Sequence, residues 1–304
     1  MKIDRLRARL DDIQQARPWL AFPYAVIKKF GADSSTNLAV LITYYTFFSV
    51  FPLLLAMFSI LGFVLHGNPH LQHRIETSTL HELPLVSGPV PKHGSVAVVV
   101  VGVVLALYSG LGVAKAAQNA WDTVYCVPQT DRPNWLQKNV RSLRLVAVGG
   151  TGLVATAVVS TSVASGGAIG LHVGFALTIL GIAVTLVLNT ALLAIVFRWL
   201  TSREVSFREV IAGAAFAAVA FEVLQAIASA FIAHKLKGAK ATYGAFGTVV
   251  VLLSWFYLQS VVLLLAAQVN VVKQDRLWPR SMRAGSTEPR RDGPEETGSS
   301  ERSA

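Results

Sequence analysis

The stretch Val96–Leu107, VAVVVVGVVLAL, decides the fold class of this chain. It contains no polar side chain, so it lacks the alternation of inward and outward residues that marks a strand of a membrane barrel. Lipid offers the backbone no hydrogen-bond partner, and a single apolar segment can satisfy its own backbone only as a helix. The stretch therefore predicts an all-α membrane protein.

Five further apolar stretches lie on either side of this one, and each is close to the roughly 20 residues that a helix needs to cross a bilayer. We therefore predict a polytopic membrane protein with six transmembrane helices. The six predicted spans are Leu38–Leu65, Ser95–Leu111, Leu145–Val163, Phe175–Leu200, Val210–Ile232 and Phe246–Val272. They divide the chain into a cytoplasmic N-terminal and interfacial segment (1–35), a six-span membrane domain (36–273) and a disordered cytoplasmic tail (274–304).

The composition agrees with a membrane protein, because 53% of the 304 residues are hydrophobic and only 14% are charged. The mean hydropathy is +0.52, and too few charges remain to cover a water-facing globule. The net charge of +10 raises the question of nucleic acid, but we expect membrane lipid to be the partner instead. Cys126 is the one cysteine, which excludes an internal disulfide framework. The first apolar run is too long for a cleavable targeting segment.

Lysine and arginine residues fall mainly in alternate connections, which predicts the orientation of the spans. Twenty-two of the 27, with Arg198 at the end of the fourth span included, lie before the first span, between the second and third, between the fourth and fifth, or after the sixth. The other five lie in the remaining connections. Because positively charged connections stay in the cytoplasm, both ends of the chain are expected there. An odd number of spans would break this alternation.

Aromatic and basic residues gather just before the first span, at Trp19, Phe22, Tyr24, Lys28 and Lys29. They predict a helix that lies at the cytoplasmic surface of the membrane. The alternative is a solvated helix that packs on its own protein.

Glu222 is the sharpest single residue, because it stands in the middle of an otherwise apolar span. A charge at that depth costs at least about 2.5–3.5 kcal/mol unless a partner compensates it. Polar groups that could meet it are Gln225, Asn189, Gln268 and Asn270, with Gln259. Glu222 is thus a candidate for binding substrate or accepting a proton in an internal cavity. The alternative is a protonated glutamate that hydrogen-bonds between helices.

Pro52 lies near the middle of the long first span, about two turns after Tyr44, Tyr45 and Thr46. Proline removes a backbone hydrogen bond, so this span must tilt, kink or split. A broken helix would free carbonyl groups to bind substrate, which makes Tyr44 and Pro52 further cavity candidates. A packed kink explains the same residues equally well.

The end of the second span carries small residues, among them Ser109, Gly110 and Gly112, followed by polar ones. Small residues allow helices to pack closely. A second interpretation is the inner mouth of a substrate path, whose cationic groups attract anionic lipid head groups. The predicted cytoplasmic rim consists of Lys115, Gln118, Asn119, Arg141 and Arg144.

No motif predicts a metal, a cofactor or a catalytic centre. His66, His70 and His73 have spacings that would align them on a helix, but Gly67 and Pro69 interrupt it, so we interpret them as solvated loop residues. Tyr243 and Gly244 predict a turn into the last span. The chain has no phosphate-binding loop, no Cys-x-x-Cys pair and no Gly-x-Ser-x-Gly elbow, so we expect neither a hydrolase nor a nucleotide-driven transporter.

Three blocks of sequence resemble those of the YihY/virulence factor BrkB family. They are YYTFFSVFPLLL (44–55), LYSGLGVAKAAQNAWDTVY (107–125) and YGAFGTVVVLLSWFYLQSVVLLLAAQVN (243–270). The resemblance implies a bacterial inner-membrane protein with six spans and a poorly defined activity in the cell envelope. A ribonuclease label has been attached to the family, and we regard it as a misassignment.

The chain departs from the family pattern at two places. Gln268 stands where the resemblance implies a glutamate, and no proline precedes the fifth span near Thr201. If the acid carries a proton or an ion in relatives, this chain lacks that step. Our leading hypothesis is a protein that transports or accommodates an envelope lipid or other amphiphile. The alternative is an envelope scaffold that transports nothing.

Overall fold

The computed structural model describes residues 18–65, 96–168, 175–239 and 244–278, and these residues are helical apart from short turns. This confirms the all-α fold class. The helices are α2 (Pro18–Ala32), α3 (Ser35–Leu65), α5 (Val96–Val124), α6 (Trp135–Ala168), α7 (Phe175–Leu200), α8 (Phe207–Ala239) and α9 (Gly244–Gln274), with a short 3₁₀ turn η2 (Gln129–Asp131).

The chain divides into two units. Residues 26–276 form the larger unit, which contains α3 to α9 and the last turns of α2. The smaller unit consists of residues 1–25 and 277–304. In its described part, the rings of Phe22 and Trp278 meet edge to face with centroids 5.3 Å apart. The aromatic and basic residues before the first span thus lie in a helix, Pro18–Ala32, as predicted, and its position at the membrane surface stays a prediction.

Among the described residues, five helices are long and apolar enough to cross a membrane. They are α3, α5, α7, α8 and α9, and each overlaps one predicted span. Helix α6 covers the third predicted span but is not among the five. The structure therefore supports a polytopic membrane protein, and the count of six spans stays a prediction.

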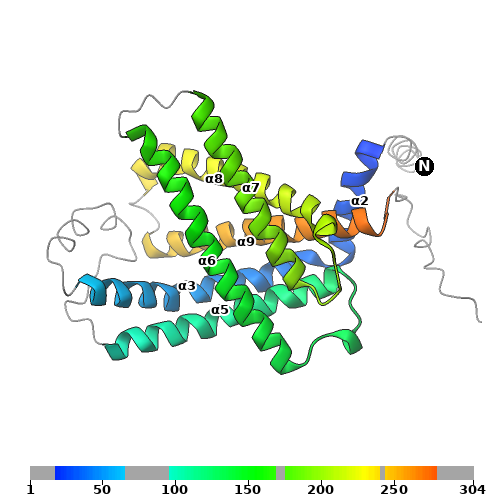
Figure 1. Cartoon of the computed structure of the whole chain (residues 1–304), viewed down its shortest axis with the longest axis horizontal. Coiled ribbons are helices and arrows are strands. Elements are labelled where there is room, and N and C mark those ends of the chain that lie inside the picture. The colour runs from blue at the N-terminus through cyan, green and yellow to red at the C-terminus, as the bar shows by residue number, and fades with distance from the viewer. Residues whose placement is uncertain (1–17, 66–95, 169–174, 240–243, 279–304) are drawn as a thin grey trace, which may run out of the picture. The chain divides into compact units, whose positions relative to one another are not determined.

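Within the larger unit, four helices lie side by side in the order α5, α3, α9 and α8, and α6 and α7 cross them as an antiparallel pair (Figure 1). The crossing pair packs on the four-helix layer mainly through α5 and α8. Close helix packing needs small side chains, and a Cβ at Gly102 in α5 would stand 3.1 Å from the Cα of Ala56 in α3.

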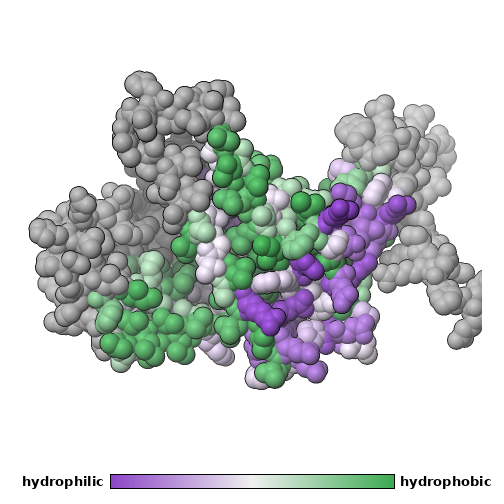
Figure 2. All heavy atoms as spheres, in the orientation of Figure 1, coloured by the Kyte–Doolittle hydropathy of each residue, from purple (hydrophilic) through white to green (hydrophobic). Residues whose placement is uncertain are grey.

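Buried residues gather at one end of the larger unit, which we call the polar end. Here α3, α6 and α8 begin and α5, α7 and α9 end. Figure 2 shows hydrophilic residues around the first turns of α6 and the turn between α7 and α8, and hydrophobic residues over the far ends of α3 and α5. Buried polar side chains at this end are Lys29, Ser35, Gln118, Asp122, Ser142, Thr201, Gln268 and Asn270.

Away from the polar end, the helices expose apolar side chains such as Val100, Leu153 and Val187. Between 6% and 28% of the apolar window of each candidate span is buried inside the chain. In water such an exposed surface would aggregate, whereas hydrocarbon solvates it. The exposure therefore agrees with a lipid environment.

The helices differ from the predicted spans mainly at their ends, and α6 begins at Trp135, ten residues before Leu145. Helix α5 continues beyond Leu111 to Val124 because an alanine-rich sequence without proline follows, and the chain turns at Cys126 with a φ of 54°. Helix α3 passes through Pro52 as one element. The broken helix that would free carbonyl groups for substrate is therefore not formed.

Candidate functional site

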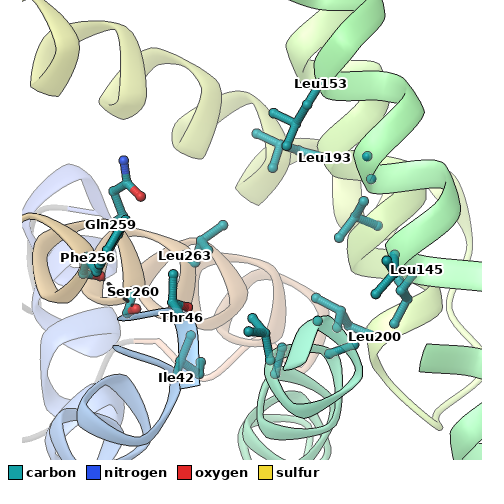
Figure 3. A pocket seen from close by; sticks show the side chains of 18 of the residues that line it. Ile42, Thr46, Leu145, Leu153, Leu193, Leu200, Phe256, Gln259, Ser260 and Leu263 are labelled. Atoms are coloured by element: carbon teal, nitrogen blue, oxygen red, sulfur yellow. Dashed lines mark hydrogen bonds between the residues drawn. The ribbon is translucent and has the colours of Figure 1, made fainter. Parts of the chain in front are cut away.

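A pocket of about 700 Å³ lies inside the larger unit, between the crossing pair α6–α7 and the layer that contains α3 and α9. Figure 3 shows Leu153 and Leu193 on one side of it and Thr46, Phe256 and Gln259 on the other. It forms because α6 and α7 are attached through α5 and α8 and diverge from α3 and α9. The crossing geometry of the helices thus creates the space.

The lining of the pocket is mostly apolar and carries no charged side chain among the described residues. Such a lining favours an apolar ligand, with a few polar groups to fix its orientation. The polar side chains, apart from two tryptophans, are Thr46, Ser49, Asn189, Gln225, Gln259 and Ser260.

Of the seven predicted cavity residues, the structure places Asn189 and Gln225 in the pocket. Glu222 does not line it. Its carboxylate accepts a hydrogen bond from Asn189 Nδ2 at 3.3 Å, and Glu222 is exposed whereas Asn189 is half-buried. Glu222 therefore stands beside the pocket and reaches it through Asn189.

Tyr44 and Pro52 do not line the pocket either. The Tyr44 ring is 55% exposed and lies among aromatic neighbours of its own helix, with its centroid 4.7 Å from that of Phe48. Its neighbour Tyr45 packs against Gly112, where a Cβ would stand 3.0 Å from the ring. These residues belong to the α3–α5 contact and the outer surface, because α3 turns only one face toward the pocket.

Gln268 and Asn270 are fully buried at the polar end and not in the pocket. Gln268 Nε2 donates to Asp33 Oδ2 at 2.8 Å and to Ser35 Oγ at 3.1 Å. Asn270 Oδ1 accepts from the backbone N–H of Gly213. Both amides therefore tie helix ends together.

Lys29, expected at the membrane surface, belongs to the same network. Its Nζ is buried, pairs with Asp33 and donates to the carbonyl of Val124 at 2.9 Å. This one interaction joins the end of α2 to the end of α5.

The predicted cytoplasmic rim is divided by the structure. Arg141 donates to the carbonyl of Thr201 and to Ser202 Oγ, and Lys138 donates to Asn119 Oδ1. Gln118 Nε2 donates to Ser142 Oγ at 2.8 Å. Arg141 is thus used to hold the end of α7, while Arg144 is exposed and Lys115 half-buried.

Partial burial changes the pKa of two cations in the first turns of α6, Arg141 and Lys138. Desolvation lowers the pKa of the Arg141 guanidinium, and the nearby carboxylate of Asp122 opposes that change. Desolvation likewise lowers the pKa of Lys138, again opposed by Asp122. Asp122 is therefore a counter-charge that Arg141 and Lys138 share.

Asp122 follows Gln118 and Asn119 in the polar segment that the sequence assigns to the cytoplasmic rim, and it is one of only two acids, with Asp131, between Leu83 and Ser202. It is buried, and its carboxylate accepts from the backbone N–H of Ser202 at 2.7 Å and from Ser202 Oγ at 3.0 Å. It caps the turn after α7.

Two aromatic rings close the pocket toward the polar end. Trp121 and Phe197 are fully buried, line the pocket and have centroids 5.2 Å apart. Beyond them lie the Asp122–Ser202 hydrogen bonds. The pocket thus has an aromatic floor with a buried polar layer behind it.

No group of three or more potential metal ligands occurs in the described part of the chain. His66, His70, His73 and Tyr243 lie outside the described residues, so the interpretations given to them stay predictions.

A family model described as "Virulence factor BrkB" matches residues 26–290. A UPF0761 membrane protein of Pseudomonas paraeruginosa is 26% identical over 86% of this chain and 65% of its own length. Inner membrane protein YhjD of Escherichia coli is 24% identical over 80% of this chain and 78% of its own length. The chain thus spans just under two thirds of the length of the Pseudomonas relative.

A shorter match joins this chain to a ribonuclease-like protein, YfkH, of Bacillus subtilis. It is 31% identical over 75 residues, which cover 25% of this chain and 27% of YfkH. So short a match does not support ribonuclease activity here. No solved structure matches this chain.

Proposed function

Because this chain belongs to the virulence factor BrkB family of membrane proteins, we propose that it binds an envelope lipid or other amphiphile in the pocket and transports it. We place the protein in the bacterial inner membrane, with both termini in the cytoplasm. One observation carries the proposal: a pocket of about 700 Å³ with an apolar lining and a few neutral polar groups. This is the chemistry of a site for a largely apolar ligand.

The packing of the helices suggests how such a ligand would enter and leave. The floor at Trp121 and Phe197 is closed, and Asp122, Ser202 and Arg141 are bonded behind it. A lipid would therefore enter from the bilayer or from the opposite end. Release toward the polar end would require these contacts to open.

Gly149 provides a sharp test, because it lines the pocket and a Cβ added there meets no atom within 4 Å. Gly149→Phe should therefore fill the pocket without distorting α6, and it removes a poor helix former. Gly31→Phe is the matched control, since Gly31 in α2 also has open space and lies outside the pocket.

Native mass spectrometry of the full-length protein, released from membranes, would measure the lipid that co-purifies. We expect a stoichiometric lipid on the wild type and on Gly31→Phe, and its loss from Gly149→Phe. In reconstituted vesicles the same substitution should reduce lipid flux. Equal lipid content in all three proteins would show that the pocket binds none.

A scaffold without transport is the second candidate, and one observation favours it. Glu222, the charged residue at apparent membrane depth, is exposed on the surface and absent from the pocket lining. A polar surface group within hydrocarbon suits contact with another membrane helix. If Glu222→Ala abolished co-purification of a partner protein while Gly149→Phe changed nothing, the scaffold would be preferred.

A further inference from the structure

We infer that the pocket selects lipids whose polar part is uncharged and rich in hydroxyl groups, such as a sugar-bearing diacylglycerol. Asn189, Gln225 and Gln259 would recognise that part, and Glu222 would position Asn189. The inference rests on the proposed function, because it names the class of lipid that the pocket takes.

Three carboxamides line the pocket, one each from α7, α8 and α9. A carboxamide carries both donors and an acceptor, so it matches hydroxyl groups, which also do both. Within the described part of the chain, the side chains of Gln225 and Gln259 make no hydrogen bond, and Asn189 uses only its Nδ2. Most of the hydrogen-bonding capacity of the three amides is therefore available to a ligand.

Two of the three hydroxyl groups of the lining, those of Ser49 and Ser260, present acceptors rather than donors. Ser49 Oγ donates its proton to the carbonyl of Thr46 at 2.7 Å, and Ser260 Oγ donates to that of Phe256 at 2.8 Å. Their remaining lone pairs can only accept. A phosphodiester has no proton to give them, whereas a sugar has several.

Charge also disfavours an anionic head group in this pocket. No lysine or arginine lines it among the described residues, and the charged group nearest to Asn189 is the acid Glu222. Three cations at the polar end already have partners: Arg141 bonds Ser202, Lys138 bonds Asn119, and Arg203 pairs with Asp275. A phosphate that left water for this lining would remain uncompensated.

Glu222 has a defined part in this arrangement. Its carboxylate accepts a hydrogen bond from Asn189 Nδ2 and so orients the amide, which leaves the Oδ1 of Asn189 free to accept from the ligand. Glu222→Gln keeps an acceptor for Asn189, whereas Glu222→Leu removes it. Glu222 is thus a positioning residue that acts through Asn189.

The test is a lipid titration of the full-length protein by native mass spectrometry. The probes are glucosyl-diacylglycerol, phosphatidylglycerol and plain diacylglycerol, all with the same two acyl chains. Pocket binding is defined as the binding that Gly149→Phe removes and Gly31→Phe keeps. We expect the glucolipid to bind at least roughly fivefold more tightly than the other two, about what one net hydrogen bond supplies.

Substitutions of the amides in the lining should remove the preference for the glucolipid but not the binding of the acyl chains of a lipid. Asn189→Leu and Gln259→Leu should bring the glucolipid to the affinity of diacylglycerol, while Gln129→Leu, an exposed glutamine outside the pocket, should change nothing. Glu222→Leu should weaken glucolipid binding as Asn189→Leu does, with no further loss in the double variant. Glu222→Gln should retain it.

Two failures can be told apart. Pocket binding of phosphatidylglycerol as tight as that of the glucolipid, or a preference that survives both Asn189→Leu and Gln259→Leu, would overturn the inference and leave the lipid pocket in place. No binding that depends on Gly149 would overturn the proposed function, and the inference with it.

Discussion

Asn270 Oδ1 in α9 lies 2.6 Å from the backbone nitrogen of Gly213 in α8 and accepts its hydrogen bond. The two helices meet so closely here that a Cβ at position 213 would stand 2.1 Å from the carbonyl oxygen of Ala266. Backbone cannot yield as a flexible side chain can, so only glycine fits at this position.

Gly213→Ala should therefore separate α8 from α9 and lower the free energy of unfolding by about 1–3 kcal/mol, the usual cost of overpacking. The measurement is the Tm of the full-length protein in detergent. Gly31→Ala is the control, since a Cβ there meets open space and should leave the Tm unchanged or raise it. Equal Tm values for the two variants would contradict the close approach.

Asp122→Ala should destabilise the polar end, because Ser202 loses two hydrogen bonds and Arg141 loses its nearby carboxylate. Leaving such buried donors without an acceptor costs about 1–3 kcal/mol. Asp122→Asn keeps one acceptor and should cost less. Hydrogen exchange at Thr201–Ser206 would report the loosened turn, and protection as in the wild type would contradict the role given to Asp122.

Gln268→Glu should destabilise this protein, because it replaces the donor to Asp33 by a second carboxylate. The amide oxygen of Gln268, Oε1, is buried without a hydrogen bond in the described part of the chain, so a carboxylate at position 268 would gain no partner on that side. Two carboxylates repel when both are ionised, and the loss in Tm should be larger at pH 8 than at pH 5.

Gln268→Met is the control for that substitution, since it removes the donor without adding charge. Its loss in Tm should be similar at both pH values. If Gln268→Glu showed the same lack of pH dependence, Asp33 and residue 268 would not interact electrostatically.

Burial raises the pKa of Tyr125 from its ordinary value of 10.0 to about 12, an effect that nearby Asn270 partly offsets. The folded state thus retains this proton at pH values where the unfolded chain loses it. The contribution of this pKa shift to the free energy of unfolding is fully present below pH 10. It is lost as the pH rises toward 12, by up to roughly 2–3 kcal/mol. Tyr125→Phe should lack this alkaline decline in Tm.

An optical titration provides a second measurement for the same group. Tyr125 should ionise near pH 12, so the tyrosinate absorbance that appears near that pH should decrease in Tyr125→Phe. The same absorbance near pH 12 in the wild type and in Tyr125→Phe would contradict the burial of this hydroxyl.

The orientation of the spans can be measured with reporter fusions. A reporter that is active only in the cytoplasm should be active when it is fused after Gln274. A reporter that is active only outside the cytoplasm should be active when it is inserted within residues 66–95, because positively charged connections stay in the cytoplasm. Opposite results at both positions would show that the spans have the reverse of the predicted orientation. Results that place residue 274 and the N-terminus on different sides would exclude six spans.

The sequence alone determined the class of the molecule. Apolar runs such as Val96–Leu107 have too few polar groups to be solvated by water, and their backbone must bond within its own helix, so the membrane and the helices follow from local composition. The three sequence blocks also identified the family that the comparison later matched. Helix ends were less predictable, because α5 continues into a polar segment that is still alanine-rich.

Only the tertiary structure decided which polar residues share a site. The sequence placed Glu222, Asn189 and Gln268 within spans, but the periodicity of a helix gives the face of a residue and not the helix that it meets. Because α6 and α7 cross the other helices, Asn189 and Gln225 line the pocket, whereas Glu222 lies beside it. Gln268 instead meets Asp33, 235 positions away in the chain, since α9 and the start of α3 pack at the polar end.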